Sequence, residues 1–141
     1  MGAKTGSNSM TKKDAIPAGC PCGSAQIHQA CCGPYLSGER RAQTAEQLMR
    51  ARYCSFVYRN ERYLLSTWHP TTRPNSVQFD ERQRWLGLSI RETQAGNPND
   101  QEGHVEFVAR FKVTGKGHRL HEKSRFAKVG DNWYYVSGEF L

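Results

Sequence analysis

The sequence predicts an α+β domain in which the helices come first and an antiparallel sheet follows. Residues 44–57 and 61–68 carry apolar side chains at helical spacing. The stretch from Val105 to Val113 alternates apolar and polar residues, which is the pattern of a strand with one buried face. Because the helical patterns precede the strand patterns and do not alternate with them, the two kinds of element should segregate in the fold.

The first helix is expected to begin after Thr44. Thr44 is a favourable N-cap, and Gln47 three residues later completes a capping-box pattern. The apolar positions that follow at helical spacing are Ala45, Leu48, Met49, Tyr53, Phe56 and Val57. Asn60 marks the end of this helix. The second helix then ends at His69-Pro70, because the residue before a proline avoids the helical region.

Four strands and one short helix are expected in the remainder of the chain. A loop containing Pro70 and Pro74 leads into the short helix at 80–84. The strands follow at 85–92, 105–113, 120–126 and 133–136. The segments that connect them are rich in turn residues, at 95–100, 114–118 and 130–132.

Three segments are expected along the 141 residues. Residues 1–16 have the composition of a disordered tail or an expression scar, with Met10 as an alternative start. Residues 17–38 have little periodic apolar content, so a bound metal would supply their folding energy. Residues 40–141 form the α+β domain, which we expect to have its own core. The N-terminal residues lack the apolar stretch of a signal peptide, which predicts a cytoplasmic protein with no membrane association.

A cysteine cluster is the strongest chemical signal in the chain. Four of the five cysteines lie close together, as Cys20, Cys22, Cys31 and Cys32. Two pairs of thiolates from two short turns can hold one zinc ion tetrahedrally, in a structural site. Gly23 and Gly33 each follow the second cysteine of a pair, where glycine allows a tight turn. Two disulfides or a redox role are the alternatives, and a reducing cytoplasm favours the metal.

Two further residues bear on this site. His28 lies in the loop between the cysteine pairs and is a candidate replacement ligand. With four thiols present, a solvated position for His28 is the favoured interpretation. Cys54 lies alone on the first helix and is interpreted as a small buried residue.

The segment CPCGSAQIHQACCG resembles the SEC-C motif, the cysteine-rich zinc knuckle found at the C-terminus of the SecA translocation motor and on many bacterial proteins. All four ligand positions of that motif are present here, and the resemblance implies one structural Zn²⁺ ion. In SecA-type proteins the knuckle is implicated in contacts with the acidic chaperone SecB and with ribosomes, so the resemblance also implies a protein partner.

Residues 17–141 as a whole are similar to the YchJ-like family of small bacterial proteins, whose activity is uncharacterised. The similarity rests on TAEQLMRARYCSFV, on LLSTWHPTTRP and on LHEKSRFAKVGDNWYYVSGEF. It implies a nuclear-transport-factor-2-like (cystatin-like) fold. In that fold the helices pack in the mouth of a strongly curved antiparallel sheet, and the two together form a cone.

A second candidate site lies inside such a cone. Glu122 and Ser124 fall on the apolar face of the sheet if Phe111 pairs with Leu120. A carboxylate on that face needs a partner, and the candidates are His69, Arg91 and Arg125. A register shifted by one residue would place His121 on this face instead. Paired with His69, Glu122 could act as a general base, but anchoring of the loop at 68–73 is the favoured interpretation.

Charge and motifs favour a binding protein over an enzyme. The net charge is +7, but the 20 basic residues are scattered, which disfavours nucleic-acid binding. Lys12 and Lys13 before the knuckle, with Arg40 and Arg41 after it, suit an acidic protein partner. A small-molecule ligand, or catalysis, in the cone is the alternative. The sequence contains no phosphate-binding glycine loop, nucleophile elbow or metal-ligating His-Glu helix.

Overall fold

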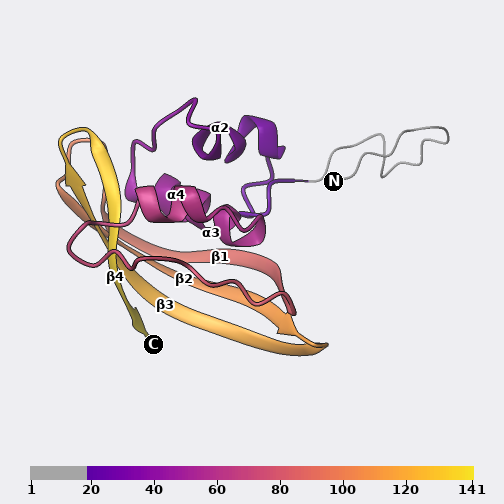
Figure 1. Ribbon diagram of the computed structural model, residues 1–141. Helices are drawn as coiled ribbons and strands as arrows, with labels where there is room; N and C mark the ends of the chain where they lie inside the picture. Colours follow the sequence, from indigo (N-terminus) through magenta and orange to yellow (C-terminus); the bar gives the residue numbers. More distant parts are fainter. Residues whose placement is uncertain (1–18) are drawn as a thin grey trace, which may run out of the picture.

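The computed structural model describes residues 19–141, in which helical segments are followed by one four-stranded antiparallel sheet. Helices α3 (Ala45–Val57) and α4 (Glu61–Ser66) lie across one face of the curved sheet (Figure 1). The predicted α+β class is therefore confirmed. The proposed tail, with Lys12 and Lys13, lies outside the described residues.

Helix α3 begins as its sequence predicts. The Thr44 side chain accepts a hydrogen bond from the Gln47 backbone N–H, at 3.1 Å. The Gln47 side chain in turn accepts from the backbone N–H of Gln43, at 2.7 Å. Two backbone donors that the helix cannot satisfy internally thus find acceptors, which fixes where α3 starts.

Helix α4 is shorter than predicted and ends at Ser66. Asn60 follows α3 and is also the N-cap of α4, because its side chain accepts a hydrogen bond from the Tyr63 backbone N–H, at 3.0 Å. The chain leaves the helix early because the next residues pair with the sheet. His69 donates its backbone N–H to the Tyr135 carbonyl at 2.8 Å, and Tyr135 donates to the Thr67 carbonyl at 2.8 Å. This segment covers one edge of the last strand, which would otherwise be unpaired.

The sheet is an antiparallel meander in the order β1-β2-β3-β4. The strands are β1 (Gln83–Ala95), β2 (Glu102–Val113), β3 (Lys116–Val129) and β4 (Asn132–Phe140). All four are longer than the alternating patterns predict, because their end residues pair through the backbone and bury little side chain. No helix forms at 80–84, where the Asp80 carboxylate accepts from the Arg82 backbone N–H in a tight turn.

The register between β2 and β3 differs by two residues from the predicted one. Phe111 pairs with His118, and Leu120 pairs with Ala109. The connection is the two-residue turn Thr114-Gly115, in which both residues have positive φ, as a type I′ hairpin requires. An even shift preserves the face of each side chain, so Glu122 still shares the apolar face with the buried side chain of Phe107.

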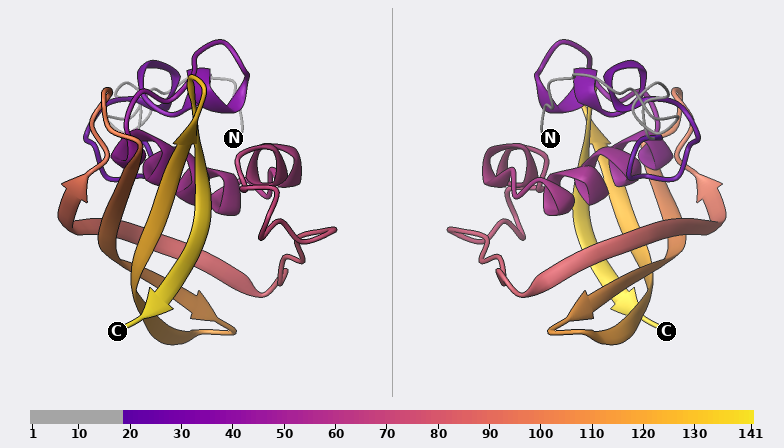
Figure 2. Two further views of the ribbon diagram at one scale, coloured as in Figure 1. Left: turned by 90° about the vertical axis from the view of Figure 1, so that its left-hand side faces the viewer. Right: turned by 90° about the vertical axis from the view of Figure 1, so that its right-hand side faces the viewer.

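The sheet curves around α3, as Figure 2 shows. Irregular pairing accompanies this curvature, with register shifts in β1 at 85–87 and 90–92 and a further shift between β3 and β4. The buried core between helix and sheet includes Leu48, Val105 and Phe126, each almost fully inaccessible to solvent.

The cysteine-rich segment packs against this same core. It contains a short 3₁₀ turn, η1 (His28–Ala30), and a single helical turn, α2 (Gly33–Leu36). Cys20, Cys22 and Cys32 belong to one continuous cluster of buried residues with the core side chains of α3 and the sheet. The knuckle and the α+β domain therefore share a core.

Candidate metal centre and cone cavity

The four predicted ligands come together in space. The sulfur atoms of Cys20, Cys22, Cys31 and Cys32 all lie within 4.8 Å of one another. Two of the separations are 3.6 Å, between Cys22 and Cys31, and 3.9 Å, between Cys31 and Cys32. A tetrahedron with metal–sulfur bonds of about 2.3 Å has edges of about 3.8 Å, so this cluster has the dimensions of a four-thiolate metal site.

Local backbone geometry brings the two cysteine pairs together. The Gly23 N–H donates to the Cys20 carbonyl at 3.0 Å, closing a turn over the first pair, and Gly23 has φ of +85°. Gly33 is required for a different reason, since a Cβ there would lie 2.9 Å from the His28 carbonyl oxygen. A side chain at either glycine would strain the knuckle, by backbone conformation at Gly23 and by contact at Gly33.

Polar groups surround the sulfurs. The Ser24 hydroxyl lies 3.0 Å from the Cys31 sulfur, and the His28 Nδ1 atom lies 3.3 Å from the Cys20 sulfur. Arg50 of α3 donates to the Cys22 carbonyl at 2.6 Å, which ties the knuckle to the helix. Of the four candidate ligands, only Cys31 is partly exposed. The site is thus closed by protein, as structural metal sites are.

Cys54 reaches the edge of this cluster from α3. Its sulfur lies 3.5 Å from that of Cys20 and is fully buried, and Cys20, His28 and Cys54 form a second group of close ligand atoms. The prediction of a small buried residue is confirmed, but its contact with the cluster was missed. The linear sequence gives little signal for it, because Cys54 lies 34 residues from Cys20.

The crowding of the thiols shifts their pKa values in opposite directions. Hydrogen bonds donated by the Cys32 and Cys54 thiols lower the pKa of Cys22 well below the ordinary range. The same interaction with Cys22 raises the pKa of Cys32, and burial raises the pKa of Cys31. Cys22 is therefore the thiol of this cluster that most readily supplies the thiolate that a metal binds.

A second site is a cavity of about 240 Å³ between α3 and the sheet. It is lined by Met49, Arg52, Tyr53, Phe56, Trp68, Trp85, Phe107, Ala109, Leu120, Glu122, Ser124 and Tyr135. Of the predicted pocket residues, Glu122 and Ser124 line it, and the Ser124 hydroxyl donates to Glu122 Oε2 at 2.9 Å.

The other candidate partners of Glu122 lie elsewhere. The His69 ring is engaged by Thr71, with 2.8 Å between Nδ1 and the hydroxyl, because the backbone pairing of His69 with β4 directs it away from the cavity. Arg91 is exposed at the irregular pairing of β1. Arg125 lies 3.7 Å from Glu102, and His121 pairs with Glu106 at 2.7 Å on the opposite face of the sheet.

Arg52 is the residue of this cavity that sequence reasoning missed. It is only 4% exposed, and its Nη1 donates to the Leu64 carbonyl and the Thr67 hydroxyl, each at 2.7 Å. Burial lowers its pKa to about 10. A signal was available in the sequence, because position 52 lies four residues after Leu48, on the apolar face of the helix.

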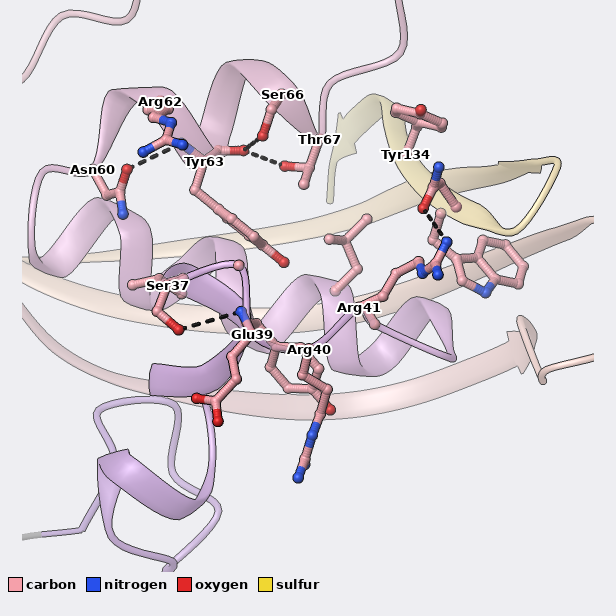
Figure 3. Close-up of a pocket in the computed structure, with 17 residues that line it drawn as sticks. Ser37, Glu39, Arg40, Arg41, Asn60, Arg62, Tyr63, Ser66, Thr67 and Tyr134 are labelled. Atoms are coloured by element: carbon pink, nitrogen blue, oxygen red, sulfur yellow. Dashed lines mark hydrogen bonds between the residues drawn. The ribbon is translucent and has the colours of Figure 1, made fainter.

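A larger groove of about 490 Å³ runs between the knuckle, the helices and the start of β4. Figure 3 shows its polar side chains, among them Arg40, Arg41 and Arg62. Arg41 donates to the Asn132 side chain at 3.3 Å. Within residues 19–141 none of the three arginines forms an ion pair.

The α+β domain matches a family model, and the chain has close relatives. Residues 44–138 match the model described as the YchJ, middle NTF2-like domain. A UPF0225 protein of Streptomyces avermitilis is 48% identical over 138 residues, covering 98% of this chain and 96% of that protein. A UPF0225 protein of Chromobacterium violaceum is also 48% identical, over 92% of this chain and 98% of that protein.

Solved structures agree with these matches. A SEC-C motif containing protein from Rhodopseudomonas palustris superposes with a TM-score of 0.76 at 33% identity, over 86% of this chain and 98% of that one. A second, from Psychrobacter arcticus, gives 0.68 at 28% identity, over 84% and 80%. None of the helices in the described residues has the length and apolarity needed to cross a membrane. The chain belongs to the UPF0225, or YchJ-like, family, with a SEC-C cysteine motif ahead of an NTF2-like domain.

Proposed function

We propose that this protein is a zinc-stabilised interaction module that binds an acidic segment of a partner protein. One zinc ion would be held by Cys20, Cys22, Cys31 and Cys32, since four closely spaced thiols at tetrahedral separations suit zinc. The role of the metal is structural, because four protein ligands leave no open position for a substrate.

The observation that supports this function is the connection between the metal cluster and the groove. Cys32 is followed directly by α2, and the residues after α2 form one wall of the groove with Arg40 and Arg41. Arg62 approaches from α4 on the other side. The metal therefore fixes the wall that carries two of the three arginines.

The charges in this groove suit carboxylates. Arginine pairs with carboxylates through two parallel hydrogen bonds, and the three guanidinium groups have no acidic partner among the described residues. Glu39 also lines the groove, which disfavours a polyanion such as nucleic acid and favours a partner of mixed polarity. An acidic protein surface, such as that of a chaperone or a ribosome-associated protein, has the required chemistry.

The test is a titration of the zinc-loaded protein against a fluorescent peptide that alternates glutamate with leucine. The double variant Arg40→Glu and Arg41→Glu should weaken binding at least tenfold. The matched control is the double variant Arg110→Glu and Arg119→Glu, which changes charge equally at cross-strand neighbours away from the groove. Equal weakening by both pairs, or preference for a single-stranded DNA probe, would refute the proposal.

The metal is tested separately by native mass spectrometry of protein purified without chelator. The expected mass is one chain plus one zinc ion. A chain four protons lighter with no metal would instead indicate two disulfides. If the zinc is present but the peptide does not bind, the metal assignment stands and the interaction proposal fails.

A further inference from the structure

The cavity between α3 and the sheet contains two opposite charges that do not pair with each other. Arg52 enters from α3 and Glu122 from β3. Within residues 19–141, neither forms an ion pair within 4.0 Å. Two unpaired charges inside a mostly apolar cavity are costly unless something else satisfies them.

The guanidinium of Arg52 has N–H donors that form no hydrogen bond in the described part of the chain. Its Nη1 atom donates both hydrogen bonds, to Leu64 and Thr67, while Nε and Nη2 donate none within the described part of the chain. The group lies over two aromatic rings, 4.9 Å from the centre of Trp68 and 4.6 Å from that of Tyr135. Ring faces stabilise the cation but accept no strong hydrogen bond, so the free edge is suited to an oxyanion.

Trp68, which lines the same cavity, carries a second unsatisfied donor. Its indole Nε1 is buried and has no acceptor among the described residues, where it is the single buried side-chain nitrogen or oxygen in that state. Trp68 lines the cavity and packs against Tyr135, with 5.1 Å between ring centres. Buried N–H groups are almost always paired, so this one indicates that an acceptor is missing.

Glu122 presents an acceptor from the sheet. Its carboxylate rests on the backbone of Gly138, where a Cβ would lie 1.8 Å from Oε2. Ser124 donates to the same Oε2 and Tyr135 also hydrogen-bonds the carboxylate, which leaves acceptor positions on its two oxygens for a further donor. Burial first, and then the nearby Glu122 charge, raise the pKa of Tyr135 to about 12, so that hydroxyl remains a donor beside the carboxylate.

We infer that this cavity binds a small amino or hydroxy acid with an apolar side chain. Its carboxylate would pair with the free edge of Arg52 and accept from Trp68, and its amine or hydroxyl would donate to Glu122. The apolar body would lie against Phe107, Ala109 and Leu120. At about 240 Å³ the cavity is smaller than the roughly 300 Å³ at the lower end of ordinary ligand pockets, which limits the occupant to a molecule of amino-acid size.

This inference is independent of the proposed interaction groove, because the two sites share no lining residue. It is tested by calorimetric titration of the full-length, metal-loaded protein with four compounds on one carbon skeleton. These are leucine, the matching hydroxy acid, the matching unsubstituted acid and the matching amine. The amino or the hydroxy acid should bind, the unsubstituted acid about tenfold more weakly, and the amine not detectably.

Three variants make the test specific. Glu122→Gln should reduce the affinity for the better ligand about tenfold while leaving the unsubstituted acid within about twofold. Leu120→Trp should abolish binding by filling the cavity while retaining every polar group. Glu139→Gln, an exposed glutamate near Gly138, is the matched control and should change nothing.

Arg52 itself is a poor first variant, because its hydrogen bonds to Leu64 and Thr67 also hold α4. Circular dichroism of each variant establishes that it is folded before binding is measured. Failure of all four compounds to bind at millimolar concentration would overturn the inference. So would binding that survives Leu120→Trp, since the ligand would then lie outside the cavity.

Discussion

Removal of the metal is expected to destabilise the whole chain and not only the knuckle. The reason is the shared core, in which Cys20 contacts Cys54 of α3, and Tyr35 of α2 and Leu48 of α3 belong to one buried cluster. Without metal, four crowded thiols have lost the ion that would hold them together, and the knuckle has little apolar packing of its own.

The loss of unfolding free energy can be estimated from the side chains that would become exposed to solvent when the knuckle unfolds. Tyr35 and Leu48 account for about 2 kcal/mol each and Cys54 for about 1 kcal/mol, or about 5 kcal/mol in total. For a chain of this length, about 3 °C per kcal/mol converts this loss into a fall in Tm on the order of 15 °C.

The measurement is differential scanning calorimetry of the protein with and without a chelator. One transition should move to lower temperature and remain single. Cys22→Ser is the matched variant, since it should already melt at the lower temperature and respond no further to chelator. A separate low-temperature transition for the knuckle, with the main Tm unchanged, would refute the shared core.

Three further predictions follow from individual residues. Gly138→Ala should displace the Glu122 carboxylate and cost about 1–3 kcal/mol in urea unfolding, whereas Gly87→Ala, at a site with open space, should cost less than 1 kcal/mol. Thr44→Ala should lower the unfolding free energy by about 1 kcal/mol through loss of the α3 cap, and an unchanged urea midpoint would contradict that role. Tyr53 and Tyr135, whose pKa values burial raises to about 12, should show no phenolate absorbance near pH 10, where the unfolded chain ionises. Because the folded chain then holds more protons than the unfolded one, stability should fall as pH rises from 10 to 12. A phenolate signal near pH 10 in the folded protein that disappears in the Tyr53→Phe or Tyr135→Phe variant would contradict this.

The fold could be predicted where local chemistry decides it. The cap at Thr44 and the alternation from Val105 to Val113 are properties of short segments, and both appear as expected. The end of α4 could not be predicted, because it depends on the pairing of His69 with Tyr135, far along the chain. The predicted β2–β3 register differs from the observed one by two residues. A two-residue turn and a longer turn give the same alternation of buried and exposed side chains, so the alternation alone could not decide between them.

The candidate sites divide in the same way. The four clustered cysteines are close in sequence, so their convergence is readable from spacing. The cavity is built from α3, β3 and β4, and its cation is Arg52, whose partners emerge only when the helix is placed on the sheet. His69 and Arg91 were reasonable partners for Glu122 by charge, but backbone pairing and strand irregularity direct them elsewhere.

Helix α3 connects the two sites. Arg50 and Cys54 reach the knuckle, while Arg52 and Tyr53 line the cavity, all within two turns of one 13-residue helix. A helix is stiff along this length, so a displacement that follows loss of the metal must also move Arg52 relative to Glu122 on the sheet. Metal loading and occupation of the cavity should therefore be coupled, with each increasing the affinity for the other by the same factor. The coupling requires no contact between the metal and the ligand, because each of them would stabilise the same position of α3 on the sheet.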